Sequence, residues 1–320
     1  MTLLGIVWNP EDTLFNLGPL QIKYYNSLWI AAFIVGWQLM KRIFTTEGKP
    51  IDKLDSLFVY SVVSIMLGAR LGHVFFYDWA YYQHHIIEIL LPIREQRNAS
   101  LFGLINGYTF TGFTGLASHG AAVAAIIGLY LYSRKFKEID FLWLVDRIAI
   151  PSAIGGAFVR LGNFFNSEIN GKPVEEGFVF ATKFVRDHDD LSAYNALQIT
   201  GQSSVSNAYN AIVNDPAYSE VLASIPYRHP VQLYEAVAYA LLFVVLFYVI
   251  YPKPHLRNKP GFLFGLWLVG IFSARFILEY FKKSQGGFEE SLGLLTTGQW
   301  LSIVPIIAGL ALMFRKSKVY

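Results

Sequence analysis

Long apolar runs recur along the chain and are separated by polar stretches. A bilayer core takes about 20 apolar residues in helical form, and seven runs fall near that length. They cover residues 24–40, 57–77, 116–132, 141–165, 231–251, 261–281 and 299–314. This pattern predicts an all-α integral membrane protein with seven transmembrane helices.

Two stretches between the predicted spans are too long for simple turns. Residues 78–115 contain a short apolar run, 86–93, that is too brief to span, so we expect an outer interfacial or re-entrant arm there. Residues 166–229 are polar with scattered aromatic side chains, which favours a small folded head domain over disorder. The chain then divides into a four-span region with the arm (1–165), the head (166–229) and a three-span region (230–320).

Basic residues follow the first, third, fifth and seventh predicted spans. They are Lys41, Arg42, Lys49, Lys53, Arg134, Lys135, Lys137, Lys253, Arg257, Lys259, Arg315, Lys316 and Lys318. Basic residues close to span ends mark the cytoplasmic side, so the N-terminus is predicted to lie outside and the C-terminus inside. Lys282 and Lys283 are the exception to this pattern. The N-terminus has no basic region before the first span, so a cleavable signal peptide is not expected.

Composition excludes most other classes of protein. The chain is 54% hydrophobic and 15% charged, whereas soluble chains carry about 25% charged residues. It has no Cys, which rules out disulfides, thiolate metal sites and a cysteine nucleophile in the chain itself. A net charge of +3 is too small to indicate nucleic-acid binding. No His, Asp and Glu cluster has metal-ligand spacing, so we expect neither a metal nor a cofactor.

Three arginines lie inside predicted spans, where lipid tolerates charge poorly. Arg70, Arg160 and Arg275 facing lipid would together cost on the order of 8–10 kcal/mol. We therefore expect all three to face a protein-lined or water-filled cavity. By helical rise they fall in the outer half of the membrane, with Tyr25 at the start of the first span and His119 at the start of the third.

Further polar residues follow two of these arginines at helical spacing. They are Asn163, Asn166 and Glu168 after Arg160, and Glu279 and Lys282 after Arg275. Residues three or four apart share a helix face, so Asn163 lies with Arg160 and Glu279 with Arg275. Glu279 either holds Arg275 in place or forms an ordinary interfacial ion pair, and the spacing fits both.

Several arginines at one depth are typical of an anion site, because a guanidinium matches a phosphate with two parallel hydrogen bonds. A phosphate-bearing lipid is the obvious anion of the outer leaflet. His119, in the Gly-rich stretch 112–120, can accept a proton near neutral pH. The alternative is that each arginine only ties helices together. His229 is either a second base or part of a turn before Pro230.

The segment 160–171, RLGNFFNSEING, resembles the signature of the prolipoprotein diacylglyceryl transferase family. It has the family's Arg, Gly-Asn-Phe, Asn, Glu and closing Gly, which is Gly171. Further segments resemble the family in the same order: GARLGHVFFY at 68–77, SHG at 118–120, HPVQLYE at 229–235, RFILEYFK at 275–282 and GQWLSIVP at 298–305. The resemblance covers nearly the whole chain, and Lys282 stands where the family has Arg.

The resemblance implies transfer of a diacylglyceryl group from phosphatidylglycerol to the lipobox cysteine thiol of a secreted prolipoprotein, the first step of lipoprotein maturation, with release of glycerol 1-phosphate. It also implies a bacterial cytoplasmic (inner) membrane enzyme with seven spans, outer arms and a small periplasmic head domain, so that the N-terminus is periplasmic and the C-terminus cytoplasmic. Arg160 and Arg275 would hold the head group and the leaving phosphate, and His119 would be the base or a hydrogen-bond donor to the phosphate. The expected substrate-binding residues are Tyr25, Arg70, Asn163, Asn166, Glu168, Gly171, Glu279 and Lys282.

Two other classes of function fit parts of the pattern. An anion or lipid transporter would use the same arginines as a binding site along a pore. The chain shows no internal repeat and gathers its polar groups at one depth, and both features disfavour that interpretation. An intramembrane serine protease would need a Gly-x-Ser-x-Gly motif inside a span, which the sequence lacks.

Overall fold

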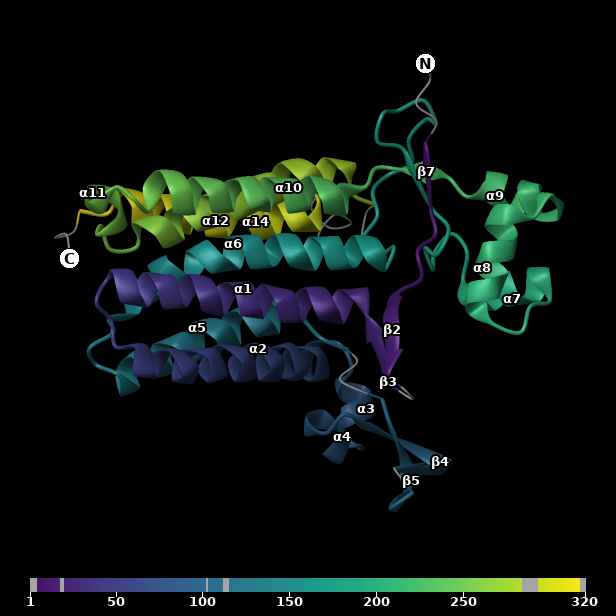
Figure 1. Ribbon diagram of the computed structural model, residues 1–320, viewed down its shortest axis with the longest axis horizontal. Helices are drawn as coiled ribbons and strands as arrows, with labels where there is room; N and C mark the ends of the chain where they lie inside the picture. The colour runs from purple at the N-terminus through teal and green to yellow at the C-terminus, as the bar shows by residue number, and fades with distance from the viewer. Residues whose placement is uncertain (1–4, 18–19, 102, 112–114, 284–292, 317–320) are drawn as a thin grey trace. The chain divides into compact units, whose positions relative to one another are not determined.

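A computed structural model describes residues 5–17, 20–101, 103–111, 115–283 and 293–316 (Figure 1). The chain forms two compact units, which are described one after the other. The first contains residues 1–40 and 146–320, and the second contains residues 41–145.

Six helical segments in the described part of the chain are long and apolar enough to cross a membrane. They are Tyr24–Thr46 (α1), Ile51–Phe76 (η1 Ile51–Lys53 with α2 Leu54–Phe76), Phe141–Phe165 (α6), Val231–Ile250 (α10 Val231–Val244 with η3 Val245–Ile250), Phe262–Phe281 (α12 Phe262–Leu278 with η4 Glu279–Phe281) and Thr297–Phe314 (α14). This confirms the prediction of a mostly helical, multi-pass membrane protein.

The predicted third span, 116–132, is also helical. It forms α5, Ser118–Lys135, which is rich in Ala, Gly and Tyr and bears Arg134 and Lys135 in its last turn. α5 is not among the six apolar segments, because its small and polar residues dilute the hydrophobicity of its 18 residues. The seventh span therefore stays a prediction.

The all-α prediction is too narrow, because the described residues also form small sheets. A three-stranded sheet joins β1 (Ile6–Trp8), β6 (Thr182–Phe184) and β7 (Tyr227–Arg228), with β1 parallel to β6. Hairpins pair β2 (Thr13–Leu17) with β3 (Leu20–Lys23), and β4 (Ile93–Leu101) with β5 (Ile105–Phe110). Strands this short show little alternation, and the β1–β6 pair joins distant residues, so local patterns do not reveal them.

In the first unit, α10, α12 and α14 run side by side (Figure 1). The close approach of α12 and α14 requires glycine, since a Cβ at Gly265 would lie 2.6 Å from the carbonyl of Gly309 and the reverse also holds. Asp146 of α6 accepts hydrogen bonds from the backbone N–H groups of Gly261 and Phe264, at 2.7 and 2.8 Å. Asp146 thereby caps α12, the helix that carries Arg275.

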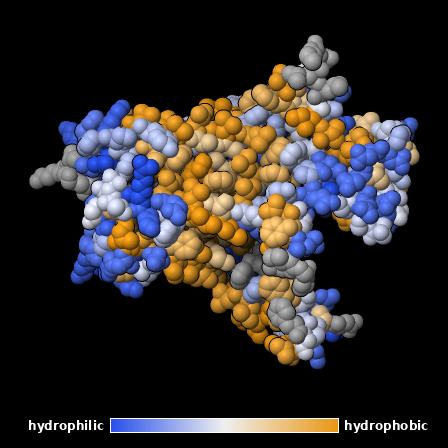
Figure 2. Space-filling view, viewed as in Figure 1, coloured by the Kyte–Doolittle hydropathy of each residue, from blue (hydrophilic) through white to orange (hydrophobic). Residues whose placement is uncertain are grey.

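Residues 166–229 contain a hydrophobic cluster of their own. Helices α7 (Ala193–Thr200), α8 (Val205–Asn214) and α9 (Ser219–Ser224), with the short η2 (Pro216–Tyr218), surround side chains that include Tyr209 and Ile212. The visible surface over α7–α9 is mostly hydrophilic, whereas that over α10 is mostly hydrophobic (Figure 2). This contrast separates a segment that suits water from one that suits lipid.

In the second unit, α2 and α5 pack backbone to backbone through small residues (Figure 1). A Cβ at Gly68 would strike the carbonyl of Gly120, a Cβ at Gly120 would strike that of Gly68, and a Cβ at Gly128 would strike Ser64. Small residues four apart on both helices are a usual means of close packing in membranes. They place Arg70 and His119, next to Gly68 and Gly120, at one level of this helix pair.

The predicted arm, 86–93, lies in the second unit between α2 and α5. Two short helices, α3 (Trp79–Tyr82) and α4 (Ile87–Leu90), precede the β4–β5 hairpin. The arm and the hairpin expose large apolar side chains, among them Ile86 of the arm (71% exposed) and Leu104 between β4 and β5 (86% exposed). Exposed apolar surface of this kind suits a membrane interface. The hairpin itself was not expected from the sequence. A further short helix, α11 (Pro254–Arg257), precedes α12 in the first unit.

Candidate active site

A fully buried carboxylate lies between two cations in the first unit. Glu235, on α10, has Oε2 at 2.7 Å from Nε of Arg160 and Oε1 at 2.8 Å from Nζ of Lys282. Arg160 comes from α6 and Lys282 directly follows η4, so three segments meet at one carboxylate. A buried charge is tolerated only when it is paired in this way.

The contacts of Glu279 decide whether it holds Arg275 or forms another ion pair, which its spacing in the sequence left open. Its buried carboxylate pairs with Lys282 at 3.4 Å. The carboxylate packs against Gly298 at the start of α14, where a Cβ would overlap it. Within the described residues, Arg275 has no ion-pair partner and its buried Nε has no hydrogen-bond partner. Glu279 therefore holds Lys282 rather than Arg275.

Tyr239 lies within the electrostatic reach of both arginines. It is buried on α10, one turn after Glu235, and accepts a hydrogen bond from Arg160. The charge of Arg275 also acts on its phenol. The structure thus brings Arg160 and Arg275 to the same region of the first unit, as the sequence predicted for both arginines.

The signature residues that follow Arg160 form a chain of hydrogen bonds. Nη1 of Arg160 donates to Oδ1 of Asn163 at 3.2 Å, and Nδ2 of Asn163 donates to Oε1 of Glu168 at 2.8 Å. Asn166 donates to the same oxygen at 3.3 Å. Glu168 consequently orients Asn163, and Asn163 orients the guanidinium of Arg160.

Tyr25, near the N-terminus, and Gly171, in the middle of the chain, border this group. The Tyr25 ring lies against Gly162, since a Cβ at Gly162 would come within 2.7 Å of the ring. The Tyr25 phenol interacts electrostatically with the charges of Arg160 and Glu168. Gly171 donates its N–H to the carbonyl of His229 at 3.0 Å. Its backbone also forms an isolated antiparallel β-bridge with Lys282. A Cβ at Gly171 would lie 2.6 Å from His229, so this position requires glycine.

His229 has the surroundings of a structural turn. Its carbonyl accepts hydrogen bonds from Gly171 and Val231, and its ring packs edge-on to Phe178 and Phe281 with centroids 4.9 and 5.0 Å away. Burial lowers the pKa of His229, because the charged imidazolium loses hydration there.

Arg70 and His119 belong to the second unit. Arg70 is buried, donates to the carbonyls of Ile89 at 3.0 Å and Glu88 at 2.5 Å, and stacks over the ring of Tyr82 at 4.7 Å. It also lines a cavity of about 110 Å³ together with His73 of α2 and with residues of α3, α4 and the β4–β5 hairpin. These contacts tie α2 to the arm, as the alternative role for the arginines describes. His119 is exposed in the first turn of α5.

The structure gathers one group of metal-binding residue types that sequence spacing did not indicate. Ligand atoms of His85, Glu88 and Glu95 lie within 4.8 Å of one another. Glu88 already accepts hydrogen bonds from the Tyr81 hydroxyl at 2.9 Å and from the N–H of Glu95 at 2.8 Å. These bonds give Glu88 a structural role in fastening α4 to the hairpin.

The chain matches the family model described as prolipoprotein diacylglyceryl transferase over residues 12–315. The chain belongs to the prolipoprotein diacylglyceryl transferase family. It is 36% identical over 315 residues to a phosphatidylglycerol–prolipoprotein diacylglyceryl transferase of Tolumonas auensis, covering 98% of each chain. It is also similar to proteins of the same name from Bacteroides fragilis (37% identical, 98% of this chain and 95% of the relative) and Chloroherpeton thalassium (34%, 98% and 95%).

Two residues of this buried polar group were missing from the sequence-based set. Glu235 is a charged residue at the start of a predicted span, and Tyr239 follows it by one helical turn. The insertion cost that singled out the arginines applies to Glu235 as well, so its position alone was a usable signal. Tyr239 carries no such signal, because tyrosine is common in membrane helices and only the fold aims it at Arg160.

Proposed function

We propose that the chain transfers the diacylglyceryl group of phosphatidylglycerol to the lipobox cysteine thiol of a prolipoprotein, with release of glycerol 1-phosphate. Family membership makes the chain a membrane transferase of lipoprotein biosynthesis. The observation that best supports the detailed proposal is the paired Arg160 beside an Arg275 that no described carboxylate neutralises. Such a site can receive an anionic head group.

The arginines have complementary roles in this proposal. Arg160 is held by Glu235, Asn163 and Tyr239, whereas none of the described residues accepts a hydrogen bond from Nε of Arg275. As the bond between the glycerol carbon and the phosphate oxygen breaks, negative charge develops on the leaving phosphate. Fixed cations stabilise such charge without reorganising during the reaction, which lowers the barrier.

The nucleophile comes from the substrate, since the chain contains no Cys. A free thiol has a pKa of about 8.5, so a base is needed to generate thiolate at neutral pH. The thiolate sulfur forms the new bond to the glycerol carbon, and the thiol proton passes to the base. His119 is our candidate for that base, and the alternative that it donates a hydrogen bond to the phosphate is retained.

We further propose the membrane arrangement expected from the sequence. α5 serves as a seventh span, residues 166–229 form a periplasmic head domain, and the enzyme lies in the bacterial inner membrane. The hydrophilic surface over α7–α9 and the basic residues of the loops support this arrangement. The head then lies on the side where an exported precursor emerges.

A mass measurement on purified protein tests the proposal. We expect detergent-solubilised protein, phosphatidylglycerol and a lipobox peptide to give a peptide heavier by one diacylglyceryl group. Arg275→Gln should lower the rate by about 100-fold or more, because it removes a cation from the developing charge. The control Arg134→Gln, at the exposed end of α5, should keep the parental rate. Lipid flux without a covalent product would favour a transporter instead.

A further inference from the structure

The loop after α6 turns through the left-handed backbone region at two residues that are not glycine. Ser167 has φ +55° and Ile169 has φ +61°. A β-branched residue such as Ile is rarely found there, because its side chain crowds the backbone. Backbone of this kind persists only where the surrounding structure holds it, and it concentrates at functional sites.

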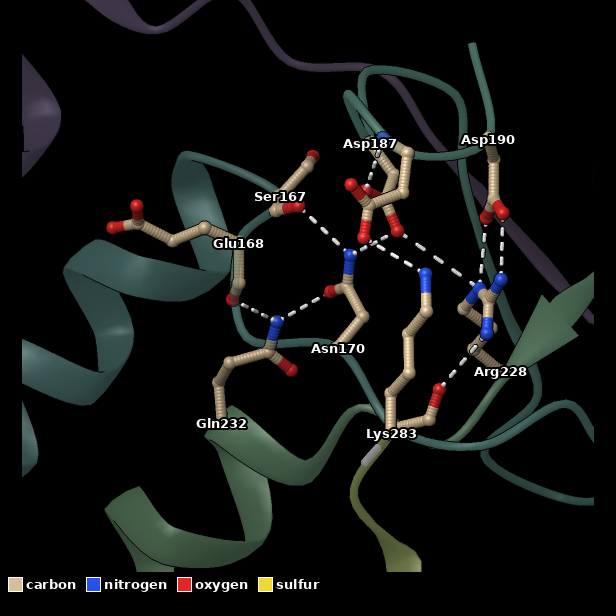
Figure 3. A network of polar contacts seen from close by, with 10 residues as sticks. Ser167, Glu168, Asn170, Asp187, Asp190, Arg228, Gln232 and Lys283 are labelled. Atoms are coloured by element: carbon tan, nitrogen blue, oxygen red, sulfur yellow. Dashed lines mark hydrogen bonds and ion pairs between the residues drawn. The ribbon is translucent and has the colours of Figure 1, made fainter. Parts of the chain in front are cut away.

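Two buried amide side chains hold this loop (Figure 3). Nε2 of Gln232 donates to the carbonyl of Glu168 at 2.7 Å and to Oδ1 of Asn170 at 2.5 Å. Nδ2 of Asn170 donates to the carbonyl of Ser167 at 2.8 Å. Gln232 is fully buried and Asn170 is 7% exposed, so water cannot substitute for these bonds without opening the site.

Charged residues brace the amides from the side of the sheet (Figure 3). Asn170 also donates to Oδ2 of Asp187 at 2.9 Å. Arg228 lies 3.9 Å from Asp187, pairs with both oxygens of Asp190 at 2.8 and 2.6 Å, and donates to the carbonyl of Gly171 at 3.2 Å. The loop is thus fastened at both its carbonyls and its closing glycine.

The left-handed residues on either side of Glu168 turn its carboxylate away from its own carbonyl. Figure 3 shows the carbonyl of Glu168 facing Gln232 and the carboxylate pointing to the opposite side. There the carboxylate accepts from Asn163, which binds Arg160. A relaxed loop would direct this carboxylate elsewhere, and Asn163, which binds the guanidinium of Arg160, would lose the group that orients it.

We propose that Gln232 and Asn170 are positioning residues for the transfer reaction: they hold the strained loop 166–171 so that Glu168, through Asn163, fixes the orientation of Arg160. Gln232 and Glu235 are three residues apart in the first turn of α10, so this turn fixes Arg160 both directly and through the loop. The inference rests on the proposed function for its catalytic meaning, but not for its structural content.

Strain relief provides the test. Gln232→Leu removes the donor and should lower the turnover number by about 10- to 100-fold, the usual scale for a misplaced catalytic group. Ile169→Gly should stay near the parental rate, because glycine adopts the left-handed region freely. If Gln232 acts by holding the strained turn, Gln232→Leu combined with Ile169→Gly should recover most of the loss.

A buried glutamine outside the loop supplies the matched control. Gln299 is 2% exposed and donates to the carbonyl of Phe276 at 3.3 Å. Ile169→Gly should not rescue Gln299→Leu, because the two positions share no strained backbone. Melting temperatures in detergent confirm that each variant folds. If Gln232→Leu does not fold, Asn170→Ala takes its place in the same pairing with Ile169→Gly.

Amide hydrogen exchange, followed in the intact protein on a peptide that covers residues 166–171, measures the stability of the loop independently of transfer activity. Exchange should rise in Gln232→Leu and fall again in the double variant. Unchanged exchange and turnover in Gln232→Leu, or a double variant no better than the single one, overturns the inference. Equal rescue of Gln299→Leu does so too, since it would indicate general stabilisation. A parent that yields no lipidated peptide refutes the proposed function alone, because the exchange pattern still decides the role of the loop.

Discussion

At the scale of single residues, Glu235 is the centre of the site. One oxygen of its carboxylate pairs with Arg160 of α6, and the other pairs with Lys282, which follows η4. The side chain of Glu235 is fully buried. Sequence reasoning identified Arg160 and Arg275 by the cost of charge in lipid and Lys282 by its position after Arg275, but not the carboxylate that Arg160 and Lys282 share. The three charged residues stabilise one another only because the fold brings them together.

Replacing Glu235 by Gln tests this assignment. The variant keeps the volume but leaves Arg160 and Lys282 facing each other in a buried site, and loss of one partner from a buried ion pair costs about 3–5 kcal/mol. We expect a clear fall in melting temperature together with loss of transfer activity. Glu220→Gln, an exposed change on α9, is the control and should alter neither. Unchanged melting of Glu235→Gln would show that the pairing contributes nothing to stability.

At the scale of elements, small residues decide which helices touch. Gly68 and Gly120 let α2 and α5 meet at their backbones, and Gly265 and Gly309 do the same for α12 and α14. The sequence indicated that these segments are helices but not which helices pair. A membrane helix is apolar toward lipid and toward a neighbouring helix alike, so hydrophobicity does not mark the contact face. Close approach needs small residues on the facing sides of both helices, and the sequence pattern of one helix does not identify its partner.

Enlarging Gly120 tests the α2–α5 contact. In Gly120→Leu the new side chain must displace the backbone at Gly68, so we expect a lower melting temperature and less folded protein. The matched change Val123→Leu lies three residues along α5 on a side chain that is 61% exposed and should be tolerated. Parental stability of Gly120→Leu would mean that the two helices do not approach as closely as described.

At the scale of the whole molecule, the distribution of basic residues gives a prediction about sidedness. The chain contains no Cys, so single introduced cysteines report without background. With the head periplasmic, Ser203→Cys between α7 and α8 should react with a membrane-impermeant thiol reagent in cells with a permeabilised outer membrane but an intact inner membrane. Lys253→Cys, after the fifth predicted span, should react only after the inner membrane is disrupted. The reverse labelling pattern would invert the proposed orientation.

The sequence alone determined where most helices lie, which polar residues lipid would not accept, and which family the motifs resemble. These properties depend on neighbours a few residues apart, so periodicity and transfer cost suffice to find them. Only the tertiary structure decided that Glu235 separates Arg160 from Lys282, that Glu279 pairs with Lys282, and that Gln232 holds the loop around Glu168. Only the tertiary structure decided, too, that strand Ile6–Trp8 pairs with strand Thr182–Phe184. Each of these is a contact between residues brought together by folding, and no local pattern carries the geometry that joins them.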